Sequence, residues 1–143
     1  MTENTGVRHG GAPASRGRTS IADVVVEKIA GMAARDVLGV HALGSGFARS
    51  MGSVRERMPG AGSGKSVTRG VSVEVGELQA AIDLEIVVDY GVSITDVAGA
   101  VRENVISAVE RMAGREVVEV NITVSDVKLP DEEDEGEERQ RIQ

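Results

Sequence analysis

The sequence contains no cysteine and no tryptophan, and Phe47 and Tyr90 are its only aromatic residues. Without cysteine there is no disulfide bond, no thiolate metal ligand and no cysteine nucleophile. Pockets for small ligands are usually lined by aromatic as well as aliphatic side chains, so this composition disfavours such a pocket. The hydrophobic core must instead be built from Val, Ile, Leu, Ala and Met, because 41% of the residues are hydrophobic and almost none are aromatic.

Long apolar stretches are also missing. A membrane-spanning helix needs a run of about 18 or more apolar residues, and the sequence has none. The N-terminus lacks the apolar segment of a secretory signal, so no such signal is predicted. Together with the absence of cysteine, these features favour a cytoplasmic protein.

Charge is distributed unevenly along the chain, whose net charge is -7 at pH 7. Residues 1–18 lack apolar periodicity and residues 131–143 are mostly acidic, which predicts a disordered N-terminal arm and a disordered acidic tail. Between them, residues 19–130 form one predicted domain. Residues 44–69 are rich in Gly, Ser and Arg and are longer than an ordinary connection, so we expect a flexible basic loop inside that domain.

Apolar periodicity predicts an α+β fold for the domain. The expected order is a first helix ending near Ala34 or Arg35, a short strand over 37–43, a hairpin, a second helix and a last strand. The hairpin joins residues 71–75 to a long strand over 80–90, the second helix covers 94–113 and the last strand covers 116–127. A strand–helix–strand unit of this kind forms a parallel crossover. We therefore expect a two-layer α/β sandwich, with a small mixed sheet and two helices on one face.

The periodicity also predicts which side chains face the core. The first helix is expected to begin at a Ser20–Asp23 capping pair and to bury Ile21, Val24, Val25, Ile29, Met32 and Ala33. The second helix is expected to begin at a Ser93 or Thr95 cap, to end at Gly114 and to bury Ile94, Val97, Ala98, Val101, Val105, Ala108 and Met112. The inward side of the long strand is predicted to carry Ile82, Leu84, Ile86, Val88 and Tyr90, and that of the last strand Val118, Val120, Ile122 and Val124.

No catalytic, cofactor-binding or metal-binding site is predicted. Residues 59–66 (PGAGSGKS) resemble a phosphate-binding loop, but Pro59 stands where that motif needs its first glycine, and no strand precedes the loop. The carboxylates on the outer sheet face, including Glu74, Asp83 and Glu85, could hold a hard cation, although solvated acids on a wet strand are far more common. His9 and His41 are isolated and make neither a zinc site nor a nucleophile–base pair.

Two surfaces remain as candidates for binding. The outer face of the sheet is a possible self-association surface, formed by Glu74, Asp83, Glu85, Val87 and Asn121. The basic loop is a possible contact for nucleic acid or anionic lipid, through Arg49, Arg55, Arg57, Lys65 and Arg69. The acidic remainder of the chain and the lack of stacking aromatic residues oppose direct binding of either ligand.

Five separated blocks point to a known family. They are Ile29-Ala-Gly-Met-Ala-Ala34 followed by Val37-Leu-Gly-Val40, Gly70-Val-Ser-Val-Glu-Val75, Ile86-Val-Val-Asp-Tyr-Gly-Val-Ser-Ile94, Val101-Arg-Glu-Asn-Val105 and Val118-Glu-Val-Asn-Ile-Thr-Val124. In this order, over about residues 20–127, they resemble the alkaline shock protein (Gls) family of bacterial envelope stress proteins. Thr95 and Arg102 depart from the family, which often has Pro and Gln there.

The resemblance implies a small α/β domain without known catalysis. It further implies an abundant cytosolic protein that self-associates and is held at the inner membrane face by a separate membrane protein. The predicted function is therefore a non-enzymatic stress-response scaffold, present as a homo-oligomer and recruited by a membrane-anchor protein. The alternative is a nucleic-acid- or anionic-lipid-binding module that uses the basic loop, residues 44–69.

Overall fold

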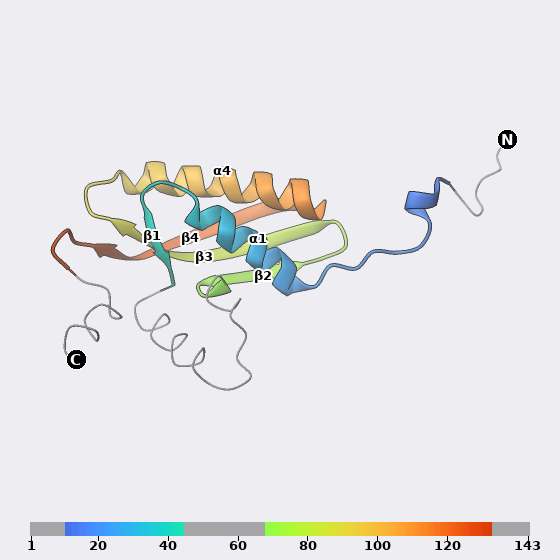
Figure 1. Cartoon of the computed structure of the whole chain (residues 1–143), viewed down its shortest axis with the longest axis horizontal. Helices are drawn as coiled ribbons and strands as arrows, with labels where there is room; N and C mark the ends of the chain where they lie inside the picture. The colour runs from blue at the N-terminus through green and yellow to red at the C-terminus, as the bar shows by residue number, and fades with distance from the viewer. Residues whose placement is uncertain (1–10, 45–67, 133–143) are drawn as a thin grey trace, which may run out of the picture.

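Two helices cover one face of a four-stranded sheet (Figure 1). The structure is a computed structural model that describes residues 11–44 and 68–132. In chain order the elements are the 3-10 turn η2 (Pro13–Ser15), α1 (Asp23–Arg35), β1 (Val40–Leu43), β2 (Val71–Val75), β3 (Gln79–Asp89), α4 (Ile94–Ala113) and β4 (Glu116–Lys128). The predicted α+β sandwich is confirmed.

The long strand β3 lies at the centre of the sheet and has two different neighbours. On one side β4 pairs with it in parallel along its whole length. On the other side two short strands pair with it in antiparallel fashion. β1 lies opposite residues 86–88 and β2 lies opposite residues 80–84, so the two lie end to end along the same side. The sheet is mixed, and β3, α4 and β4 form the predicted parallel crossover.

Helix α4 begins and ends as the sequence predicts. The Ser93 side chain accepts a hydrogen bond from the Asp96 N–H at 3.4 Å, and Gly114 ends the helix with φ +67°. The buried residues follow one line at four-residue steps: Val97, Val101, Val105, Val109 and Ala113. The prediction is wrong for Ile94 and Met112, whose side chains are 46% and 63% exposed. Ile94 begins the helix at the end of the sheet, and Met112 lies on the outer side beside α1.

The facing of α1 differs from the prediction. Its buried residues are Val26, Ala30, Gly31, Ala33 and Ala34, whereas Val24, Val25 and Met32 are exposed. Three consecutive valines are equally apolar, so the pattern could not show which of them faces the core. Small residues on the inner side let the helix lie close to its neighbours. The predicted Ser20–Asp23 cap does not form either, because the helix begins after Ala22 without a side-chain cap.

Two register irregularities change the pattern of β4. The first inserts one residue between the pairs Ala80–Val117 and Ala81–Glu119, so Val118 is the extra residue of a bulge, and the second inserts Ser125 between the pairs Ile86–Val124 and Val87–Asp126. Val117 is buried in its place and Val118 is 52% exposed, which corrects the predicted inward position of Val118. Tyr90 is also exposed, because β3 ends at Asp89. Residues 37–39 form a turn, so the predicted strand over 37–43 is shortened to β1.

Candidate interaction surfaces

The sheet face opposite the helices carries the predicted acidic and polar side chains. Neighbouring strands bring Ser72, Asp83 and Asn121 into one row, Glu74, Ala81 and Glu119 into a second, and Glu85 beside Thr123. The Asn121 side-chain amide donates to the Asp83 carboxylate at 3.0 Å and to the Glu119 carboxylate at 3.1 Å. This amide bridges two like charges and holds them on adjacent strands. We call this surface, which combines these rows, the open face.

Val87 is the one predicted member of the open face that does not lie on its surface. The side chain is 1% exposed, yet it is not part of the core cluster between the helices and the sheet. Strand pairing is irregular at this residue on both sides, toward β1 and toward β4. Val87 therefore cannot supply an exposed apolar contact. Glu74, Asp83 and Asn121 are exposed as predicted, and Glu85 is half-buried.

Most of the predicted basic contact loop lies outside the described residues, namely Arg49, Arg55, Arg57 and Lys65, together with the phosphate-loop-like residues 59–66. Arg69 is described and is half-buried. The two described ends of the loop meet at Glu85. The Gly44 N–H donates to the Glu85 carbonyl at 2.6 Å, and the Glu85 N–H donates to the Gly70 carbonyl at 2.8 Å. We call this meeting point the glycine junction.

A shallow groove of about 390 Å³ lies between α1 and α4. Met32 and Met112 border it from the two helices and are both largely exposed. The Asn104 side-chain amide joins the helices by donating to the Ala33 carbonyl at 2.7 Å. Ala33 is in the last turn of α1, where carbonyl groups have no partner within the helix. This contact explains why a polar residue lies next to the apolar stripe of α4.

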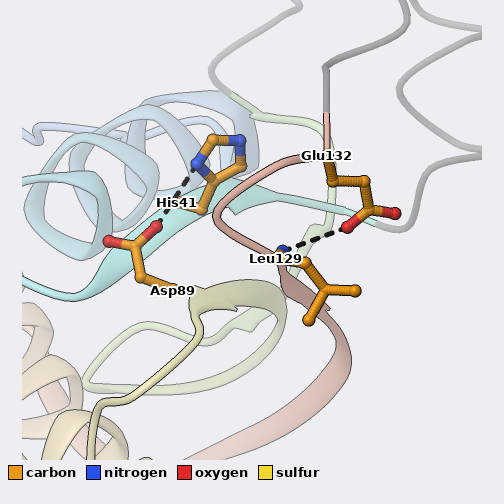
Figure 2. A network of polar contacts seen from close by, with 4 residues as sticks. All are labelled: His41, Asp89, Leu129 and Glu132. Atoms are coloured by element: carbon orange, nitrogen blue, oxygen red, sulfur yellow. Dashed lines mark hydrogen bonds and ion pairs between the residues drawn. The ribbon is translucent and has the colours of Figure 1, made fainter.

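His41 has one described carboxylate neighbour, at the end of the sheet where β1 meets β3. Its Nδ1 lies 3.5 Å from Asp89 Oδ1, and the Leu129 N–H donates to Glu132 nearby at 3.0 Å (Figure 2). A histidine and one carboxylate can tie β1 to β3, but they lack the third group of a nucleophile–base–acid arrangement. Across residues 11–44 and 68–132, no cluster of three or more acidic or histidine side chains could hold a metal ion.

Sequence reasoning missed the polar side chains of α4 that reach the sheet. Arg102 Nε donates to the Val120 carbonyl at 3.1 Å, and the Val117 N–H donates to the Glu110 carboxylate at 3.1 Å. Both side chains flank the buried valine line of α4. Their position beside an apolar stripe is a signal, but their target on β4 depends on the crossover geometry.

In the described part of the chain, no helix is long and apolar enough to cross a membrane.

Comparison with known proteins identifies the family of this chain. The model of the Asp23 family, described as having a cell envelope-related function, matches residues 11–129. The stress response regulator gls24 homologues of Streptococcus pyogenes serotypes M1 and M18 are 34% identical over 119 residues, which is 83% of this chain. The chain spans 63% of the length of these streptococcal relatives.

A relative from Bacillus subtilis, the uncharacterized protein YqhY, is 35% identical over 113 residues, covering 79% of this chain and 78% of its own length. No solved structure matches this chain. The resemblance of the five sequence blocks to alkaline shock proteins is confirmed by these matches. The chain therefore belongs to the Asp23 family of cell envelope-related proteins.

Proposed function

We propose that the protein is a non-enzymatic scaffold of the bacterial envelope stress response that self-associates. Its family supports the link to the envelope, and the name of the streptococcal relatives supports the link to stress. The observation that carries the scaffold is the one-sided sheet. Both helices lie on one face, so no described element covers the exposed rows of the open face, and the middle of the β4 edge is also uncovered by described residues.

The shape of the described surface favours protein contacts over chemistry. Lys28, Asp36 and Arg111 line the groove between the helices, but no histidine, serine or threonine does, and His41 lies beside Asp89 at the end of the sheet. A catalytic site brings a base, a nucleophile or an oxyanion donor together within hydrogen-bond distance. In the described ranges the polar groups instead bond main-chain atoms or one another along the sheet. Such contacts organise a surface for recognition.

Recruitment to the inner face of the cell membrane is the second part of the proposal, and its agent is a membrane-anchor protein. The open face carries Glu74, Asp83, Glu85 and Glu119, which anionic lipid headgroups repel. The acidic surface is better suited to a basic segment of another protein, which charge complementarity would orient and attract. We therefore expect negligible binding to pure anionic vesicles at physiological salt.

Light scattering of the purified full chain across a concentration series tests self-association. The proposal expects the weight-average molar mass to rise with concentration. A monomer at every concentration and at both low and high salt would contradict the scaffold. Since ionic contacts are screened over about 8 Å at physiological ionic strength, assembly that persists in high salt points to main-chain or apolar contacts.

Sedimentation with bacterial membranes tests recruitment. The chain should sediment with native membranes but not with membranes stripped of proteins by protease, nor with vesicles made from the extracted lipids. Equal sedimentation with the lipid vesicles would contradict a protein anchor. In that outcome the basic residues of segment 44–69 would become the main candidates for the membrane contact.

A further inference from the structure

The main chain of β3 determines which groups of β4 face the free edge. Glu85 bonds Gly44 and Gly70, so its N–H and C=O groups point away from β4. Successive residues of a strand alternate the side to which these groups point, so the residues on either side of Glu85 face β4. In a parallel pair of strands, a residue whose N–H and C=O groups point toward the neighbouring strand lies opposite a residue whose own groups point away from the pair.

This geometry leaves three residues of β4 facing outward in the middle of the strand. Val120, Ile122 and Val124 lie opposite Ile82, Leu84 and Ile86. Their N–H and C=O groups point away from β3, to the outside of the sheet. Unpaired groups on an exposed edge can accept another strand, and proteins usually block them with side chains, charges or bulges.

Side chains of α4 block the first part of this edge. The Val117 N–H donates to the Glu110 carboxylate, and the Val120 carbonyl accepts from Arg102 Nε, both at 3.1 Å. Each contact occupies a main-chain group that an incoming strand would need. Side chains of α4 therefore block main-chain groups on the edge of β4 from Val117 to Val120.

The far end of the edge is blocked as well, by a local contact. The Val127 N–H donates to the side chain of Asp126 at 2.8 Å. Between Val120 and Val127, the structure places no side chain of the described residues on the main-chain groups of Ile122 or Val124. We call residues 121–125 the edge window. It has no charged residue, whereas Glu119 and Asp126 flank it.

We propose that a second copy of this chain pairs with the edge window in antiparallel orientation, centred on Thr123. This inference rests on the proposed self-association and names the surface that provides it. In this register Ile122 of each copy lies opposite Val124 of the other, and each pair exchanges two hydrogen bonds. Two such pairs use both N–H and both C=O groups of the window in each copy. The window is therefore complementary to itself.

Charge favours the same orientation. A parallel, in-register pair would place Glu119 beside Glu119 and Asp126 beside Asp126, and like charges directly opposite one another are unfavourable. The antiparallel pair avoids both of these contacts, because Glu119 and Asp126 of one copy then lie near Val127 and Val120 of the other. Four hydrogen bonds form a small contact, so the dimer is expected to be weak. The contact is isologous and closes on itself, so a larger assembly needs a second surface such as the open face.

Disulfide formation tests the register directly, because the natural chain has no cysteine. In the proposed pair Thr123 faces Thr123 across the two-fold axis at a position without main-chain bonds, where Cβ atoms lie about 4.5–5.5 Å apart. This is close to the separation that a disulfide needs. Thr123→Cys should crosslink into a dimer under mild oxidation. Asn121→Cys is the matched control, because it faces Ser125 of the other copy and should not crosslink.

Ile122→Pro tests the hydrogen bonds of the window. Proline removes the outward N–H but no bond to β3, a position where edge strands tolerate it. The dimer dissociation constant should rise at least tenfold, whereas Ile122→Val should leave it nearly unchanged. Circular dichroism confirms that the variants fold, and the cysteine experiment stands alone if Ile122→Pro does not.

The outcomes separate this inference from the proposed function. A chain that stays monomeric contradicts both, and leaves the window to a strand of another protein. Assembly without a Thr123→Cys crosslink, and unchanged by Ile122→Pro, overturns the edge pairing while self-association stands. Equal crosslinking of Asn121→Cys and Thr123→Cys overturns the register.

Discussion

β3 pairs with other strands on both of its sides, and the two sides are built differently. On one side β4 is a single strand of 13 residues, and side chains of α4 protect part of its outer edge. On the other side β1 and β2 share the length of β3, and the chain between them leaves and returns at the glycine junction. The β4 side is one continuous strand that contains the edge window. The side formed by β1 and β2 is interrupted, but main-chain hydrogen bonds at the glycine junction close it.

This difference teaches where the fold can accept change. The main-chain bonds of Glu85 join Gly44 and Gly70 on either side of segment 45–67, so we expect the sheet to tolerate a change in the length of chain between them. β4 has no such interruption. Because side chains alternate along the strand, the facing of each residue after the first bulge depends on the residue before it. We expect changes in the interrupted side to act locally, and changes in β4 to move the whole edge.

Ile86→Ala should have the largest effect, because this buried residue serves both sides. It lies opposite Leu43 of β1 and Val124 of β4 and is fully buried. Removing a buried isoleucine side chain costs about 2–5 kcal/mol through lost burial and the remaining cavity. Urea unfolding measures the loss in the free energy of unfolding. Asp83→Ala, at an exposed position on the same strand, should change it by less than about 0.5 kcal/mol; equal losses would overturn the facing of β3.

Gly70→Ala should damage the interrupted side only. Gly70 has φ +77°, and an added Cβ would lie 2.7 Å from the Gly44 Cα and 2.8 Å from the Glu85 carbonyl oxygen. The left-handed backbone alone costs an alanine about 1–2 kcal/mol, and the clash with main-chain atoms adds to it. Hydrogen exchange should quicken in β1 and β2 but not in β4. Gly91→Ala is the control, because it has a similar φ without a neighbour within 4 Å.

Shortening segment 45–67 to six Gly and Ser residues should stabilise the fold slightly. Loop closure costs about 0.6 kcal/mol for each doubling in length, so a roughly fourfold shorter loop should gain about 1.2 kcal/mol. Guanidinium unfolding provides the measurement, with a Gly/Ser loop of the native length as the control. A loss of stability in the short variant alone would show that the sheet needs the native spacing.

Arg102→Met should have a small effect on stability and a specific one on the edge of β4. Methionine keeps the apolar stem but cannot donate to Val120, and one hydrogen bond contributes about 1 kcal/mol. The Val120 carbonyl then becomes available to a second strand, so self-association should increase while stability falls. Arg102→Lys is the control because it retains the charge. Weaker association in the methionine variant would contradict the protective role of Arg102.

The sequence predicted those parts of the fold that depend on local pattern. The Ser93 and Gly114 ends of α4, the alternation of Ile82 with Asp83 and the polar row of Asn121 and Thr123 follow from spacing alone. The facing of α1 could not be predicted, because Val24, Val25 and Val26 are equally apolar and only packing against the rest of the fold selects Val26. The bulge at Val118 also has no local signal, since it depends on the register with β3.

The candidate surfaces were predicted in part. Glu74, Asp83 and Asn121 lie on the open face as predicted, whereas Val87 is buried where the pairing of β3 is irregular on both sides. The edge window required tertiary knowledge. Arg102 and Glu110 read as solvated helix residues until the crossover brings α4 beside β4, and only then do their main-chain targets appear.

The glycine junction has a consequence for how proteins of this kind can diversify. Because Gly44 and Gly70 meet at one residue of β3, we expect that a gene can gain or lose coding sequence between them while the sheet stays intact. We expect the two glycines to be retained in relatives with the same junction, and the sequence between them to vary freely in length and composition. New binding properties could thus be acquired at this point without the slow redesign of a folded core.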